Sequence, residues 1–293
     1  MRKVAITLNI LALIASSCGQ NSTKKQTEND SVYQPESTEL SDKTENIEQS
    51  YEIEFDMVFI PQFPENEEGY RSEIKTDIEI LLPAGYREMN PADFKPMLSE
   101  KWYDFYQDSI AKKYLLKKAD IEIGKFYDDC LQDSTTYVSS QQESLILVKG
   151  IIPQHEEISS IPVKKYHVWV GEKSEFSFNG KTYVFRGDGI TIQEGMAWTD
   201  EDLPGRWDKV ENYKLYLSEQ GKEEQLIVAI PSFNDTFVQI LWIGDLDEDG
   251  KPDFILDISR DYEEKAVLLF LSSKAEKGEI VRAVASSSYQ FDC

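Results

Sequence analysis

Near the C-terminal end of the chain, four aspartates stand at a spacing that can bind a metal ion. The segment GDLDEDGKPDFILDI contains the pattern D-x-D-x-D-G-x-x-D. Ca²⁺ takes roughly six to eight oxygen ligands, and alternate positions of a curled loop aim their carboxylates at one centre. Gly250 permits the left-handed backbone that such a turn needs. The pattern predicts a calcium site whose ligands are Asp245, Asp247, Asp249, the carbonyl of Lys251, and Asp253.

The flanks of this loop predict strands rather than helices. Residues 237–243 and 254–258 are runs of β-branched and aromatic residues. An EF-hand would have helices on both sides and a glutamate at position twelve of the loop, where this chain has Leu256. The alternative interpretation is an acidic surface turn between two strands, with no bound ion.

The strand-loop-strand arrangement resembles the aspartate-rich loop of the FG-GAP and VCBS type, which occurs in integrin-like propellers and in many bacterial surface proteins. The resemblance covers about 20 residues and implies a calcium ion held by the positions named above. The chain departs from the family by carrying Glu248 where glycine is usual, and by containing the loop once. A single copy argues against a propeller, and the resemblance implies no enzymatic activity.

The N-terminus is similar to that of bacterial lipoproteins. Two basic residues precede the apolar run Val4 to Ala15, and Ser16 and Ser17 stand before Cys18. This similarity implies a signal peptide over residues 1–18, lipid modification of Cys18, and a location on the outer membrane of the cell envelope. An ordinary secretory signal is the alternative. The stretch from Tyr213 to Ser288 also looks like part of the envelope lipoproteins of Bacteroidetes-type bacteria.

Composition restricts the partners of this protein. The chain carries 31 Lys and Arg against 54 Asp and Glu, a formal net charge of -23. Such a charge repels nucleic acid, so we expect a glycan or protein partner besides membrane attachment through the lipid anchor. Trp198 and Trp207 are candidates for stacking against a glycan, with burial as the alternative. Cys130 and Cys293 form an even pair that can make a disulfide in an oxidising compartment, or remain as two thiols.

Catalytic motifs are missing from the sequence. His155 and His167 are the two histidines of the chain; there is no HExxH zinc motif, and no GxSxG nucleophile motif. The tripeptide at residues 186–188 matches the integrin-recognised RGD, which occurs by chance in chains of this length. These observations favour a binding or structural module over an enzyme. An envelope glycan hydrolase that uses a carboxylate pair, or a surface-polysaccharide biosynthesis factor, is the alternative.

The sequence predicts a mainly β (α+β) fold of antiparallel sheets. Short apolar runs with turns between them recur along the chain, including a possible strand over residues 51–60, and the Asn179-Gly180 pair predicts the type I′ turn of a β-hairpin. One helical segment is expected near residues 91–107, with Asn90 as its N-cap. A boundary between two parts of the chain is expected near residues 150–162. Residues 19–50 are almost purely polar, which predicts a disordered tether. We expect a helix-bearing, β-rich front part over residues 51–155 and an all-strand part with the calcium loop over residues 156–293.

Overall fold

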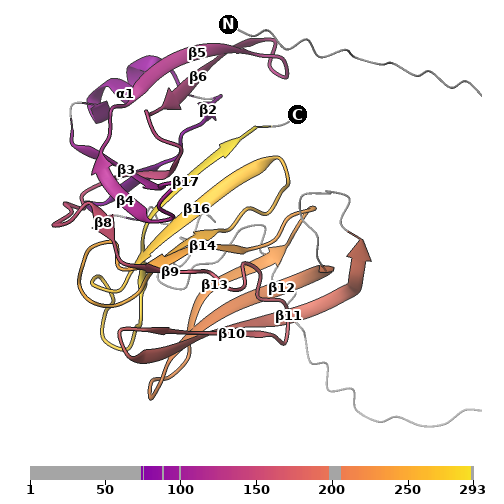
Figure 1. The fold of residues 1–293 in the computed structure, drawn as a ribbon. Helices are drawn as coiled ribbons and strands as arrows, with labels where there is room; N and C mark the ends of the chain where they lie inside the picture. The colour runs from indigo at the N-terminus through magenta and orange to yellow at the C-terminus, as the bar shows by residue number, and fades with distance from the viewer. Residues whose placement is uncertain (1–73, 75, 88, 99, 198–205, 292–293) are drawn as a thin grey trace, which may run out of the picture. The chain divides into compact units, whose positions relative to one another are not determined.

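The structure is a computed structural model, and it describes residues 74, 76–87, 89–98, 100–197 and 206–291. Within these residues the protein is mainly β, as the sequence predicts, with four antiparallel sheets and one short helix (Figure 1). None of the described helical residues forms a segment with the length and apolar character that a membrane span requires. The predicted signal peptide, tether and strand at 51–60 lie outside the described residues.

The first part of the described chain forms two sheets and the helix. The larger sheet has the order β1-β7-β3-β4-β8, which comprises Glu79–Leu81, Ser144–Lys149, Trp102–Gln107, Tyr114–Lys118 and Glu157–Ile158. The smaller sheet has the order β2-β6-β5, which comprises Gly85–Tyr86, Asp133–Ser139 and Glu122–Asp128. Helix α1 spans Pro91–Leu98.

The remaining strands form two further sheets. One, which we call the central sheet, has the order β17-β16-β15-β14-β9, with the bounds Arg282–Gln290, Glu264–Leu271, Asp253–Asp257, Gln239–Gly244 and Ser160–Ile161. The other has the order β10-β11-β12-β13, with the bounds Lys173–Phe178, Lys181–Ala197, Arg206–Glu219 and Gln225–Ser232.

The central sheet is buried on both faces. Successive residues of a strand point to opposite faces, and in β15 Phe254 and Leu256 belong to the core shared with β10 to β13. Ile255, between them, belongs to the core shared with the sheet of β1, β3, β4 and β7. This double burial explains why the middle of β15 carries three consecutive apolar residues rather than an alternating pattern.

The predicted helical segment near residues 91–107 is right in its first part and wrong in its second. Helix α1 begins at Pro91, and the Asn90 N–H donates to Asp93 Oδ2 at 2.7 Å, a contact that closes the first turn. Residues Trp102–Gln107, in contrast, form strand β3. Their aromatic residues recur at helical spacing, but the segment pairs with β4 on one side and β7 on the other. These two ladders and the β-propensity of aromatic side chains override the helical period.

The predicted hairpin at Asn179 and Gly180 is confirmed. Strands β10 and β11 pair up to Phe178 and Lys181, and the two turn residues have φ values of 45° and 78°. Both central residues of a type I′ turn need positive φ, which Asn and Gly adopt more readily than other residues. The turn therefore fixes the register of the whole hairpin.

The stretch near residues 150–162, where we expected a boundary, contains one strand for each neighbouring sheet. Strand β8 pairs with β4, and β9 pairs with β14 of the central sheet. The chain therefore passes here from the first sheet to the central one. The division into parts 51–155 and 156–293 stays a prediction.

One close approach in the core gives a test of the packing between these sheets. The Trp242 side chain is fully buried and meets the Phe105 ring edge-on at 4.9 Å between centroids. A Cβ at Gly244 would lie 2.2 Å from Trp242 Cζ2 and 2.4 Å from the Ser159 carbonyl oxygen.

We therefore expect Gly244→Ala to lower the free energy of unfolding by about 1–3 kcal/mol, measured by urea denaturation. Gly124→Ala is the matched control, because a Cβ there would meet no atom within 4 Å. Equal stabilities of the two variants would contradict the described packing of Trp242.

Candidate metal centre

The aspartate loop connects β14 to β15, and its two ends are joined by the backbone pairing of Gly244 with Asp253. Glu248 and Gly250 both have positive φ, at 60° and 87°, so two residues of this short loop adopt the left-handed backbone conformation typical of tight turns. Leu246 is fully buried in the core of the first sheet. The loop is therefore tightly curled and anchored by an apolar side chain.

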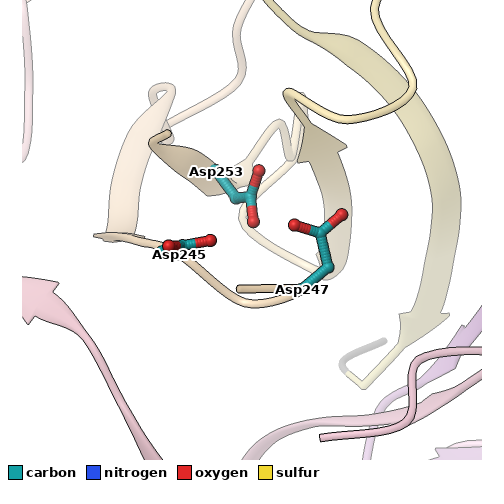
Figure 2. Close-up of side chains that lie close together, drawn as sticks. All are labelled: Asp245, Asp247 and Asp253. Atoms are coloured by element: carbon teal, nitrogen blue, oxygen red, sulfur yellow. The ribbon is translucent and has the colours of Figure 1, made fainter. Parts of the chain in front are cut away.

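This curl brings together three of the predicted ligand residues. Asp245, Asp247 and Asp253 each offer a carboxylate oxygen, and these oxygens lie within 4.8 Å of one another. Figure 2 shows the three carboxylates around a common space. Asp253 is 0% exposed and Asp245 is 7% exposed. This buried cluster could hold a metal ion.

Backbone N–H groups orient two of the three carboxylates. Asp245 accepts hydrogen bonds from the Asp249 and Gly250 amides, both at 2.9 Å. Asp253 accepts from the Leu246 amide and from the Ser272 amide, both at 2.8 Å. Ser272 follows strand β16, so the next turn of the central sheet helps to position the cluster.

The third carboxylate, Asp247, has a hydrogen-bond partner for one of its two oxygens. Its Oδ2 accepts a hydrogen bond from Ser273 Oγ. Its Oδ1 is buried and has no hydrogen-bond partner among the described residues. Buried polar atoms in folded proteins nearly always have a partner, so an unpaired carboxylate oxygen beside two other carboxylates fits a bound cation.

The electrostatics of the cluster also favour a cation. Burial raises the pKa of Asp245 and of Asp247, and burial together with the charge of Asp247 raises the pKa of Asp253 well above its ordinary value. Among the described residues, no Lys or Arg forms an ion pair with any of these three aspartates. The protein's own side chains therefore leave the negative charge of the cluster uncompensated.

Of the other two predicted ligands, the structure places Asp249 beside the cluster, with its backbone amide hydrogen-bonded to Asp245. The Asp249 carboxylate accepts from Ser272 Oγ, at 3.0 Å to each oxygen, and from the Lys251 amide at 2.8 Å. Asp249 is thus turned toward the β16–β17 turn in this arrangement and is not one of the three clustered aspartates. Its role as a ligand, and that of the Lys251 carbonyl, stay predictions.

Glu248 stands at the position where loops of the FG-GAP and VCBS type usually have glycine. Its side chain connects the loop to residues 154 and 155. Its carboxylate accepts from the backbone amides of Gln154 and His155 and lies 2.6 Å from His155 Nδ1. Burial opposes ionisation of Glu248, but these hydrogen bonds outweigh it and hold its pKa below the ordinary value. The contacts compensate for the positive φ that a non-glycine residue must adopt here.

Sequence reasoning missed the residues that support the loop from elsewhere in the chain. Besides Ser272 and Ser273, the side-chain amide of Asn179 donates to the Gly250 carbonyl at 2.8 Å. The sequence indicates Asn179 only as a turn residue. Nothing in a single sequence indicates contacts over such separations, since the two serines belong to no motif and form their contacts only through the pairing of β15 with β16.

Several predicted sites lie partly or wholly outside the described residues. Cys18, Trp198 and Cys293 fall outside them, and for Trp207 only the backbone is described. Cys130 is disulfide-bonded, and its pairing with Cys293 stays a prediction. Lipidation of Cys18 and glycan stacking by the two tryptophans stay predictions as well.

Two other sequence features have structural roles. His167 Nδ1 lies 3.0 Å from the Val238 carbonyl oxygen, and burial lowers its pKa, so this histidine is a neutral packed residue. Arg186 of the RGD tripeptide pairs with Glu224 at 2.8 Å and with Asp188 at 2.9 Å. Both charged residues of the tripeptide therefore form ion pairs within the protein.

Comparison of the chain with models of protein families, with curated proteins and with solved structures finds no match. The interpretation of the site therefore depends on the geometry described above.

The raised pKa values predict how stability changes with pH in the absence of a metal ion. A carboxyl group whose pKa is higher in the folded state favours folding below its unfolded value of about 3.9, and this contribution is lost as pH rises through the folded value. We expect Asp247→Asn to relieve the repulsion and to raise the free energy of unfolding near neutral pH by about 1–2 kcal/mol. The gain should shrink toward about pH 4, as measured by urea denaturation with a chelator present.

Asp129→Asn is the matched control, because Asp129 is exposed and lies outside the cluster. The described electrostatics would be contradicted by an Asp247→Asn variant that gains no stability at neutral pH, or by a gain that is the same at every pH.

Proposed function

We propose that this protein is a lipid-anchored, calcium-binding protein of the bacterial cell envelope, whose folded body serves as a binding or structural module. The observation that carries the proposal is the buried cluster of Asp245, Asp247 and Asp253, in which Asp247 Oδ1 has no hydrogen-bond partner. Anchoring through Cys18 is supported by the N-terminal sequence alone.

The donor set supports calcium over other metals. The clustered ligand atoms are all carboxylate oxygens, with no histidine or cysteine in the group, and hard oxygen ligands suit Ca²⁺ and Mg²⁺ rather than zinc or copper. Mg²⁺ demands a near-ideal octahedron and keeps several of its waters, whereas Ca²⁺ accepts a flexible shell that includes backbone carbonyls. A loop that curls around three carboxylates, with the Lys251 carbonyl as a predicted further ligand, fits the second requirement better.

The role supported for the ion is structural. The cluster draws its ligands from the end of β14 and the start of β15, and Ser272 and Ser273 of the next turn are hydrogen-bonded to it. An ion that binds only the folded state stabilises it by mass action. Extracellular calcium modules bind at about 10⁻⁴ to 10⁻³ M, which suffices outside the cell.

The module is proposed to act on a glycan or protein partner at the envelope, with the lipid anchor holding it to the membrane. The acidic surface supports this choice over nucleic acid, because a net charge of -23 repels a polyanion.

Calcium should raise the melting temperature of the mature protein. At about 100 times the dissociation constant, binding adds about 2.7 kcal/mol, which corresponds to roughly 5–10 °C for a domain of this size. We expect this shift in differential scanning calorimetry of the wild type with calcium relative to chelator, and no shift for Asp247→Ala.

The control variant Asp129→Ala should keep the full shift, and magnesium at the same concentration should produce a smaller one. Equal melting temperatures of the wild type in calcium and in chelator would leave the loop as an acidic turn and refute the proposal.

A further inference from the structure

A second site lies at the other end of strand β15 from the aspartate loop. There a pocket of about 390 Å³ opens between the end of β13, the β15–β16 connection and the end of β17. It is lined by Ser232, Phe233, Asn234, Arg260, Asp261, Glu263, Glu264 and Gln290. The pocket is therefore polar, with one cationic and several anionic side chains.

Arg260 differs from the other arginines whose side chains the structure describes. Arg87, Arg186 and Arg282 each form at least one ion pair with a carboxylate. Arg260 forms none within the described residues, although three acidic residues line the same pocket. The guanidinium charge of Arg260 is therefore not neutralised by an ion pair among the described residues.

The guanidinium group of Arg260 also lacks strong hydrogen-bond partners at Nε and Nη2. Its Nε is buried and has no acceptor, and Nη2 reaches Ser232 Oγ only at 3.5 Å, a weak contact. A guanidinium group presents donors in a planar fork that matches a carboxylate. The side chain therefore offers the pocket an unneutralised charge with donors to spare.

The backbone around Arg260 is held in place before any ligand binds. The Asn234 N–H donates to the Arg260 carbonyl at 2.7 Å, and the Tyr262 N–H donates to the Asn234 carbonyl at 3.0 Å. The Asp261 carboxylate is occupied by the Asn234 side chain at 2.8 Å and by the Glu263 amide at 2.9 Å. A preformed site lowers the entropic cost of binding.

The remaining lining residues restrict the ligand. Neither Glu263 nor Glu264 forms an ion pair among the described residues, so a simple anion that approached Arg260 would also meet two uncompensated carboxylates. Phe233 adds an apolar surface and packs against Phe237 at 4.7 Å between ring centroids. The pocket thus matches a small molecule that carries a negative and a positive charge beside an apolar group.

We propose that this pocket binds a small zwitterion of the α-amino acid type. Arg260 takes the carboxylate, Glu263 and Glu264 take the ammonium group, and Phe233 contacts the apolar side chain. The proposal assigns a second ligand site and does not depend on the proposed calcium function.

Three probes of matched shape test the charge requirement. L-Leucine carries both charges, N-acetyl-L-leucine only the negative one, and L-leucinamide only the positive one. In two-dimensional NMR titrations of the full mature chain, we expect leucine to shift the amide signals of Asn234 and Tyr262 with millimolar affinity. Each capped probe should bind at least about tenfold more weakly, a difference of about 1.4 kcal/mol.

Variants separate recognition from structure. Arg260→Gln should weaken leucine binding at least about tenfold, whereas Arg282→Gln, which alters an arginine outside the pocket, should not. The double variant Glu263→Gln, Glu264→Gln should weaken binding of leucine but strengthen binding of N-acetyl-L-leucine. This crossed response is one that a general loss of folding cannot produce.

The proposal is overturned if leucine causes no saturating shifts in the wild type, or if N-acetyl-L-leucine binds as well as leucine. It is also overturned if the double glutamine variant weakens both probes equally. The wild-type titrations decide the question even if Arg260→Gln fails to fold.

Discussion

Three aspartates, two of them buried and the third partly exposed, each place one carboxylate oxygen within 4.8 Å of the others, without a basic partner among the described residues. The rest of the site depends on this constraint. Such an arrangement opposes folding unless a cation enters it or the groups take up protons. The backbone amides that fix Asp245 and Asp253 offset part of this cost through hydrogen bonds. One oxygen of Asp247 has no hydrogen-bond partner among the described residues, and this favours a site that could hold a metal ion over an acidic turn.

Segments that are far apart in the sequence also contact the loop. Glu248 binds the backbone at 154 and 155, Asn179 of the β10–β11 turn reaches Gly250, and Ser272 and Ser273 come from the turn after β16. These contacts join the loop to parts of the chain on either side of the central sheet. Because that sheet contributes to both hydrophobic cores, an ion bound where β14 ends and β15 begins would act on strands that the two cores share.

The sequence predicted those features that depend on local chemistry. The turn at Asn179 and Gly180 follows from the positive φ that both residues tolerate, and the clustering of Asp245, Asp247 and Asp253 follows from their spacing. The second half of the predicted helix failed because the pairing of Trp102–Gln107 with two distant strands outweighed a helical period. Strand pairing likewise brings Ser272 and Ser273 to the loop and Ser232 to Arg260. No local pattern in the sequence predicts these contacts.

Direct measurement of calcium binding tests the central claim most directly. Isothermal titration of the chelator-treated protein should show one calcium ion bound per chain, and Asp247→Asn should abolish this binding or weaken it by at least about tenfold. Binding measured at acidic pH should release protons, because the three aspartates have raised pKa values without the ion and must be charged with it. The absence of stoichiometric binding, or binding that Asp247→Asn leaves unchanged, would contradict the account.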